Sequence, residues 1–318
     1  MRKEQCQMEE ASPADGVQAV VIWNSGAGSS RQATELLDTI RCRPDLAVFE
    51  TESREESLRR VADACRRGMA RVIAAGGDGT VNAVVTALAD WGREHRRGPA
   101  LAVLPLGTGN DLARSLGMPL IPLEAFDLCL SAGIRPMDVM ELKVDGETPQ
   151  SAGNMITAGN TGKYLTVLTD ELKQRWGALC YLRGVVNVLE DLQVFRMSLE
   201  FDGTAPIEVD ALNLFVANGR TSGGGITVCR DARLNDGHLD VLLIRDGTGL
   251  DLASLTLDYL TSDLRENELV FYRRCRKLRV SCQTSIPLST DGDAATAVRF
   301  SVSAMPSVIQ AVMVQTPQ

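Results

Sequence analysis

Aromatic residues and histidines are scarce in this chain. Phe, Trp and Tyr together make up 4% of its 318 residues, and the two histidines are His95 and His238. Because nucleic-acid surfaces that stack on bases are built from aromatic side chains, no nucleic-acid partner is expected. Two histidines also argue against a histidine-rich zinc site. A Ser-His-Asp hydrolase is disfavoured too, since the sequence has no G-x-S-x-G segment.

An excess of positive charge is also missing, and so are long apolar runs. The formal net charge is −8, whereas phosphate backbones and anionic bilayers attract clustered Lys and Arg. No run of 18 apolar residues occurs, and Met1–Asp15 lack the apolar core of a signal peptide. We therefore expect a cytoplasmic protein that meets a membrane, if at all, only transiently and as a peripheral protein at its inner face.

Short apolar runs alternate with helical patterns in the first third of the chain. Leu46–Thr51 and Val72–Ala75 are predicted strands, and Ser53–Gly68 between them has helical spacing and ends on a glycine. Two more strands are predicted at Val17–Trp23 and Leu101–Leu104. Strands of this length separated by helices indicate a parallel sheet that is covered on both faces.

The pattern changes after about residue 133. Runs rich in Val, Ile, Leu and Thr are separated by turn signals such as Asp202-Gly203 and Asn218-Gly219, which is typical of antiparallel strands. Helical stretches at Leu165–Asp191 and Leu250–Leu264 interrupt these runs. Three further strands are predicted near the end, at Lys277–Cys282, Val298–Ser303 and Val308–Val314.

This pattern predicts two domains. Residues 17–132 would form an α/β nucleotide-binding domain with a parallel sheet. Residues 133–318 would form a C-terminal antiparallel β-sandwich domain, whose final strands can return to the first domain.

Three glycine-rich turns follow predicted strands. They are Asn24–Gly28, Gly76–Thr80 and Pro105–Asp111. Glycine lets the backbone approach a ligand closely, and the start of the following helix favours phosphate through its free N–H groups. One such turn would say little, because any α/β protein has glycines in its βα turns. Three at the same edge of a parallel sheet predict a phosphate ligand. The residues assigned to this site are Asn24, Gly28, Gly76, Gly77, Asp78, Gly79, Thr80, Gly107, Thr108 and Asn110.

An acidic residue inside an anion site requires a role. Asp78 would either hold Mg²⁺ against the phosphates or orient an attacking hydroxyl. The spacing fits neither of the familiar phosphate motifs, since neither G-x-G-x-x-G nor G-x-x-x-x-G-K-[ST] occurs.

Segments along most of the chain resemble the YegS-like bacterial lipid kinases, which are relatives of diacylglycerol, sphingosine and NAD kinases. The resemblance rests on Gly76–Thr80 with Asn82, on Pro105–Ala113, on Asn218–Gly225 and on Asn235–Gly237. It implies transfer of the γ-phosphate of ATP to a lipid hydroxyl, with Mg²⁺, in a cleft between two domains. It also implies that Thr51, Gly77–Ala83 (Asn82 included) and Thr108 surround the nucleotide.

The resemblance places the proton acceptor at Asp293, in the turn Thr290-Asp291-Gly292-Asp293. Relatives usually carry Glu there, so the carboxylate of Asp293 would sit about 1.5 Å further back, a displacement large enough to affect the rate. A D-G-D segment is also an ordinary hairpin turn. A second departure is Ala83, which stands where a Glu usually follows Asn82.

A second cation and a substrate loop are also implied. A structural Mg²⁺ or Ca²⁺ would be bound by the side chain of Asp236 and the carbonyls of Arg233 and His238. Asp236 is a lone acid in this turn with no nearby base to pair it, which favours the ion; the alternative is a turn without an ion. Arg220, Gly223 and Gly224 would form a cationic loop near the lipid head group; a plain hairpin loop is the alternative.

Two other functions stay open. The first is a kinase of a soluble substrate such as NAD, because NAD kinases also use G-G-D-G-T. The second is a non-catalytic regulator that binds nucleotide or lipid, which Ala83 and Asp293 would favour.

Overall fold

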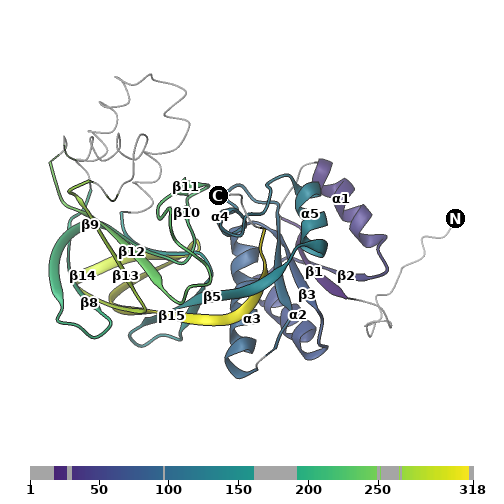
Figure 1. Ribbon diagram of the computed structural model, residues 1–318, viewed down its shortest axis with the longest axis horizontal. Coiled ribbons are helices and arrows are strands. Elements are labelled where there is room, and N and C mark those ends of the chain that lie inside the picture. The colour runs from purple at the N-terminus through teal and green to yellow at the C-terminus, as the bar shows by residue number, and fades with distance from the viewer. Residues whose placement is uncertain are drawn as a thin grey trace, which may run out of the picture.

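The computed structural model describes residues 18–26, 31–95, 97–160, 192–248, 251, 265 and 267–314. The predicted helix 165–191 and nearly all of the predicted helix 250–264 lie outside the described residues. An α/β part and a β-rich part lie side by side along the long axis of the molecule (Figure 1). Among the helices of the described ranges, none combines the length and the apolar character needed to cross a membrane.

Four parallel strands form the sheet of the α/β part, in the order β2-β1-β3-β4. They are β1 (Ala19–Asn24), β2 (Leu46–Thr51), β3 (Arg71–Gly76) and β4 (Ala100–Pro105). The central residues of β1, β3 and β4 are buried, as continuous apolar runs require when helices cover both faces, whereas those of the edge strand β2 are partly exposed. The parallel sheet predicted from the sequence is therefore confirmed.

Five helices accompany this sheet: α1 (Arg31–Arg41), α2 (Arg54–Arg66), α3 (Asp78–Glu94), α4 (Asp111–Ser115) and α5 (Pro122–Ser131). Helices α2 and α3 pack against each other, and α1 lies beside α5 away from them (Figure 1). Helix α3 begins within the glycine turn Gly76–Thr80 and continues to Glu94. Its last turns stay helical while Trp91 packs against the core of the α/β part.

Within the described residues, the strands of the β-rich part pair with one another in antiparallel fashion. Its long strands enclose a second core, which includes Leu199, Phe201 and Leu278. Its strands are β5 (Ile134–Val144), β6 (Gln150–Ala152), β7 (Met155–Gly159), β8 (Phe195–Phe201), β9 (Ile207–Ala217), β10 (Thr221–Ser222), β11 (Ile226–Thr227), β12 (Leu239–Arg245), β13 (Val270–Cys275), β14 (Lys277–Thr290) and β15 (Asp293–Val312).

Strand β15 belongs to both parts. The sequence predicts separate short strands here, whereas the structure has one strand of 20 residues with an irregularity between Met305 and Ile309. Beyond the irregularity, Gln310 and Ala311 pair in parallel with β4. Strand β5 runs antiparallel to β15 on both sides of the irregularity, so two long strands connect the parts (Figure 1).

Candidate active site

Two glycine turns touch at the start of α3. Gly77 is the N-cap residue of this helix, and it lies directly against Gly107 in the turn after β4. A Cβ atom added to Gly107 would lie 2.5 Å from the Cα of Gly77. Gly107 therefore needs to be glycine for the turns to approach this closely, whereas a Cβ at Gly77 would lie 3.4 Å from the Cα of Gly107. Their contact brings the starts of α3 and α4 together at one edge of the sheet.

Asp78 joins the same two turns. Its carboxylate accepts hydrogen bonds from the backbone N–H groups of Asn110 (3.1 Å) and Asp111 (3.0 Å). Burial raises the pKa of Asp78 above its usual value, and the nearby carboxylate of Asp111 raises it further, while the N–H donors oppose the shift. Two acids this close, in a partly buried site, create a place where a cation would be stabilised.

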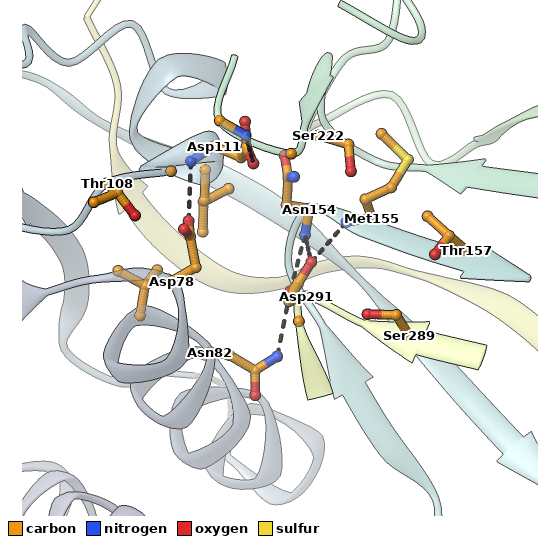
Figure 2. Close-up of a pocket in the computed structure, with 16 residues that line it drawn as sticks. Asp78, Asn82, Thr108, Asp111, Asn154, Met155, Thr157, Ser222, Ser289 and Asp291 are labelled. Carbon is orange, nitrogen blue, oxygen red and sulfur yellow. Dashed lines mark hydrogen bonds between the residues drawn. The ribbon is translucent and has the colours of Figure 1, made fainter. Parts of the chain in front are cut away.

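Two pockets flank the first turns of α3. The cleft pocket, about 520 Å³, lies between the two parts of the molecule (Figure 2). The sheet-edge pocket, about 390 Å³, lies at the ends of β1 and β2. Asp78, Val81 and Asn82 line the cleft pocket, whereas Gly79, Thr80 and Ala83 line the sheet-edge pocket. The start of one helix thus borders both pockets.

The predicted nucleotide residues divide between these pockets. Those at the sheet-edge pocket are Asn24, Thr51, Gly77, Gly79 and Thr80. Those at the cleft pocket are Asp78, Asn82 and Thr108. Gly76, Gly107 and Asn110 line neither pocket and instead shape the turns, and Gly28 lies outside the described residues. Asn110, for example, has a left-handed φ of 55° and bonds to both the N–H and the carbonyl of Gly107.

The turn between β14 and β15 also borders both pockets. Asp291 (φ 48°) and Gly292 (φ 102°) are its two central residues, between the paired residues Thr290 and Asp293. Positive φ at both positions is the geometry of a type I′ hairpin, which D-G favours. As a result Asp291 lines the cleft pocket and Asp293 lines the sheet-edge pocket.

Backbone and amide donors surround the carboxylate of Asp291. Its carboxylate accepts hydrogen bonds from the N–H groups of Gly153 (2.7 Å), Asn154 (3.2 Å) and Met155 (2.7 Å), and from the amide of Asn82 (3.3 Å; Figure 2). Burial raises the pKa of Asp291 to about 6, against the effect of these donors. Sequence reasoning assigned Asp291 no role of its own. The available signal was the D-G turn, but its meaning depends on strands far away in the chain.

Asp293 is in a more open position. Its side chain is 55% exposed and forms an ion pair with Arg54, with Nη1 and Oδ2 3.3 Å apart. Sequence reasoning assigned no role to Arg54 either, which is the first residue of α2 and also lines the sheet-edge pocket.

The predicted substrate loop lies only partly at the site. Gly223 and Gly224 line the cleft pocket, and the Asp111 carboxylate accepts the N–H groups of Gly224 (3.0 Å) and Gly225 (2.8 Å). Arg220 lines neither pocket, and its Nε donates to the carbonyl of Ala232 (3.3 Å). The glycines of the loop are therefore at the cleft, and the cationic side chain points elsewhere.

The predicted second metal site holds an ion pair. Asp236 was expected to have no base nearby, and this is wrong, because Arg274 pairs with its carboxylate. The pairing of β12 with β13 brings Arg274 to this turn from 38 residues away. Arg233, Asp236 and His238 do surround one cavity. Across the described part of the chain, no group of three or more His, Cys, Asp or Glu is arranged to hold a metal ion.

Known proteins match both parts of the chain. Residues 18–142 match the model of the diacylglycerol kinase catalytic domain, and residues 165–313 match that of the YegS C-terminal NAD kinase beta sandwich-like domain. A "Probable lipid kinase YegS-like" of Xanthomonas euvesicatoria pv. vesicatoria (strain 85-10) is 32% identical over 291 residues, 90% of this chain and 93% of that protein. A relative with the same name in Serratia proteamaculans (strain 568) is 30% identical and spans 92% of each chain.

A solved structure has the same fold. The crystal structure of a diacylglycerol kinase from Bacillus anthracis str. Sterne superimposes with a TM-score of 0.71 at 21% identity, and the match covers 95% of this chain and 98% of that one.

Proposed function

The chain belongs to the YegS-like lipid kinase family, and on this premise we propose that it transfers the γ-phosphate of ATP to a hydroxyl group of a lipid. The acceptor is a diacylglycerol, a phosphatidylglycerol or a sphingoid-like lipid. The partners are then ATP and, transiently, a lipid at the inner surface of the membrane, which a cytoplasmic protein would approach from the cytoplasm.

One observation carries this proposal: two pockets share the start of α3 and the β14–β15 turn. Phosphoryl transfer needs a donor and an acceptor on either side of the transferred group, held in line. The sheet-edge pocket, with its glycines and its helix N-terminus, suits the nucleotide. The cleft pocket suits the acceptor, since it opens between the α/β part and the β-rich part.

Mg²⁺ fits the corner formed by Asp78 and Asp111. Each oxygen of Asp78 accepts one N–H and keeps room for a further contact. Mg²⁺ in kinases is commonly held by one or two carboxylates together with phosphate oxygens. Bound there, it would neutralise phosphate charge, and Asp78 would be the residue that fixes its place.

Asp293 is the proposed proton acceptor, and Asp291 is the competing candidate. The carboxylate of Asp291 is occupied by backbone and amide donors, which suits a residue that holds the turn in place. Asp293 has one ion pair and an exposed carboxylate. Its position in the sheet-edge pocket means that the acceptor hydroxyl must enter where the two pockets meet.

Labelled ATP offered with Mg²⁺, a panel of lipids and NAD tests the function. We expect label in one of the lipids and none in NADP. Label in NADP would identify a soluble-substrate kinase. Mg²⁺-dependent ATP binding without transfer to any acceptor would identify a regulator.

A further inference from the structure

Arg54 is the basic side chain at the sheet-edge pocket. The charged residues among the described lining are Glu52, Arg54 and Asp293, so two acids face this cavity with a single cation. A triphosphate carries several negative charges, and without Arg54 it would meet two carboxylates and no basic side chain in this described lining. A guanidinium is well suited to phosphate, because its N–H groups form a planar fork.

The position of Arg54 is set by its neighbours. Ser53 caps α2 by accepting the N–H of Glu56 (3.2 Å), and the hydroxyl of Thr51 bonds to that of Ser57 (2.9 Å). Both contacts stabilise the β2–α2 turn, and this turn places Arg54 at the sheet-edge pocket. Its side chain is 38% exposed, so part of the guanidinium is open to a ligand.

The guanidinium connects α3 with the β14–β15 turn. Nη2 donates to the amide oxygen of Asn82 (2.9 Å) and lies 3.3 Å from the hydroxyl of Thr86. Nη1 faces Asp293. The amide nitrogen of Asn82 donates in turn to Asp291. Arg54 therefore reaches both acids of the turn, one directly and one through Asn82.

We propose that Arg54 binds the phosphate chain of the donor nucleotide and positions Asp293. Nη1 pairs with Asp293, while Nη2 is anchored on α3 through Asn82. Phosphate oxygens in the sheet-edge pocket bind the exposed N–H groups of the guanidinium, and the contact between Nη1 and Asp293 orients the carboxylate towards the acceptor. This inference rests on the proposed function.

Titration calorimetry with Mg·ATP, in the absence of lipid, tests the first half of the proposal. Arg54→Ala should weaken ATP binding by roughly 10- to 100-fold, the effect of losing a charged hydrogen bond, and Arg54→Lys should restore part of it. Arg59→Ala is the matched control, since it removes the same charge from an exposed position of the same helix and should leave binding unchanged. Wild-type affinity in a folded Arg54→Ala variant would overturn the proposal.

Steady-state kinetics, measured in the wild-type protein and in an Asp293→Asn background, separate the two proposed roles of Arg54, which are phosphate binding and positioning of Asp293. Arg54→Ala should raise the KM for ATP and also lower kcat, because Asp293 loses its partner. In an Asp293→Asn background, Arg54→Ala should still weaken ATP binding but cause little further loss of kcat. If the ATP affinity is unaffected in that background, Arg54 serves only as a partner of Asp293, and its role in phosphate binding is refuted. A wild-type protein that binds no ATP at all would instead refute the proposed function.

Discussion

Three acidic residues of the site use their carboxylates to hold glycine turns. Asp78 accepts N–H groups of the turn after β4, Asp111 those of Gly224 and Gly225, and Asp291 those of residues 153–155. A carboxylate can accept several hydrogen bonds and donates none when ionised, so it suits positions where backbone N–H groups converge. These acids therefore order the turns that form the candidate site.

Asp78→Asn separates this structural role of Asp78 from its proposed role in phosphoryl transfer. The amide keeps one backbone contact, so the protein should fold with a modestly lower melting temperature. Transfer to lipid should fall by roughly two to three orders of magnitude, the usual effect of removing one preorganised electrostatic contact. The labelled-ATP assay measures this change. Asp90→Asn, an exposed position on the same helix, is the control and should keep the wild-type rate. Equal transfer rates in Asp78→Asn and Asp90→Asn would show that Asp78 has no role in phosphoryl transfer.

Asp291→Asn should destabilise the fold at pH 7. The amide nitrogen would face backbone N–H donors, and we expect a loss of about 1–3 kcal/mol in the free energy of unfolding. The pKa of Asp291 is raised to about 6 from 3.8, so the folded protein takes up this proton at higher pH than the unfolded chain does. The wild type should therefore gain stability relative to the variant as pH falls from 7 to 5.

Denaturant titrations of both proteins at pH 5, 6 and 7 measure the difference. A gap between wild type and variant that does not depend on pH would mean that Asp291 titrates at its ordinary pKa.

Asp293 allows a two-sided test. Asp293→Asn should remove most transfer, by roughly 100-fold or more, because a general base is lost, while ATP affinity changes little. Asp293→Glu should change the rate in either direction. A higher transfer rate would show that the carboxylate of Asp293 lies further from the acceptor hydroxyl than is optimal. A lower rate would show that the turn has adapted to Asp. The assay is run at saturating lipid in detergent micelles. If neither substitution changes the rate, the proton acceptor lies elsewhere, and Asp291 and Asp78 are the next candidates.

The contact between the turns after β3 and β4 depends on the absence of a side chain at Gly107. Gly107→Ala would place a methyl group against the backbone of Gly77, which cannot move without shifting the start of α3. We expect weaker ATP binding and a melting temperature lower by several degrees, corresponding to roughly 1–3 kcal/mol for an overpacked contact.

Gly133→Ala provides the matched control for this change. A Cβ at Gly133 meets open space, so both the melting temperature and ATP binding should stay close to the wild type. Similar behaviour of the two variants would show that the turns can separate without consequence for the site.

The two parts of the molecule are joined through strands as well as through the cleft. Ala311 and Val312 of β15 are fully buried in the core of the α/β part, and β15 pairs with the edge of β4. We therefore expect residues 17–132 alone not to fold stably, because they lack this strand and leave the edge of β4 unpaired. Circular dichroism measures the folded structure of this fragment, and binding of a dye measures its exposed apolar surface. A cooperative melting transition of the isolated fragment would contradict it.

Local sequence was enough to predict much of this molecule. The strands of the parallel sheet follow from short apolar runs between helical patterns, and the turn geometry at Gly76–Thr80 follows from its glycines. The antiparallel character of the second half follows from its dipeptide turn signals. Each of these properties depends on residues within one or two turns of each other, which is why a single sequence reveals them.

Other properties depend on contacts between distant residues, and only the tertiary structure decided them. Arg274, the base that pairs with Asp236, comes from another strand. Strand β15 continues into the first sheet as one element. Arg54 pairs with Asp293, which lies 239 positions later in the chain. The type I′ geometry turns Asp291 to one pocket and Asp293 to the other, although the two acids are nearly adjacent in sequence. Pairing registers and side-chain directions of this kind arise from packing of the whole chain, so no local pattern contains them.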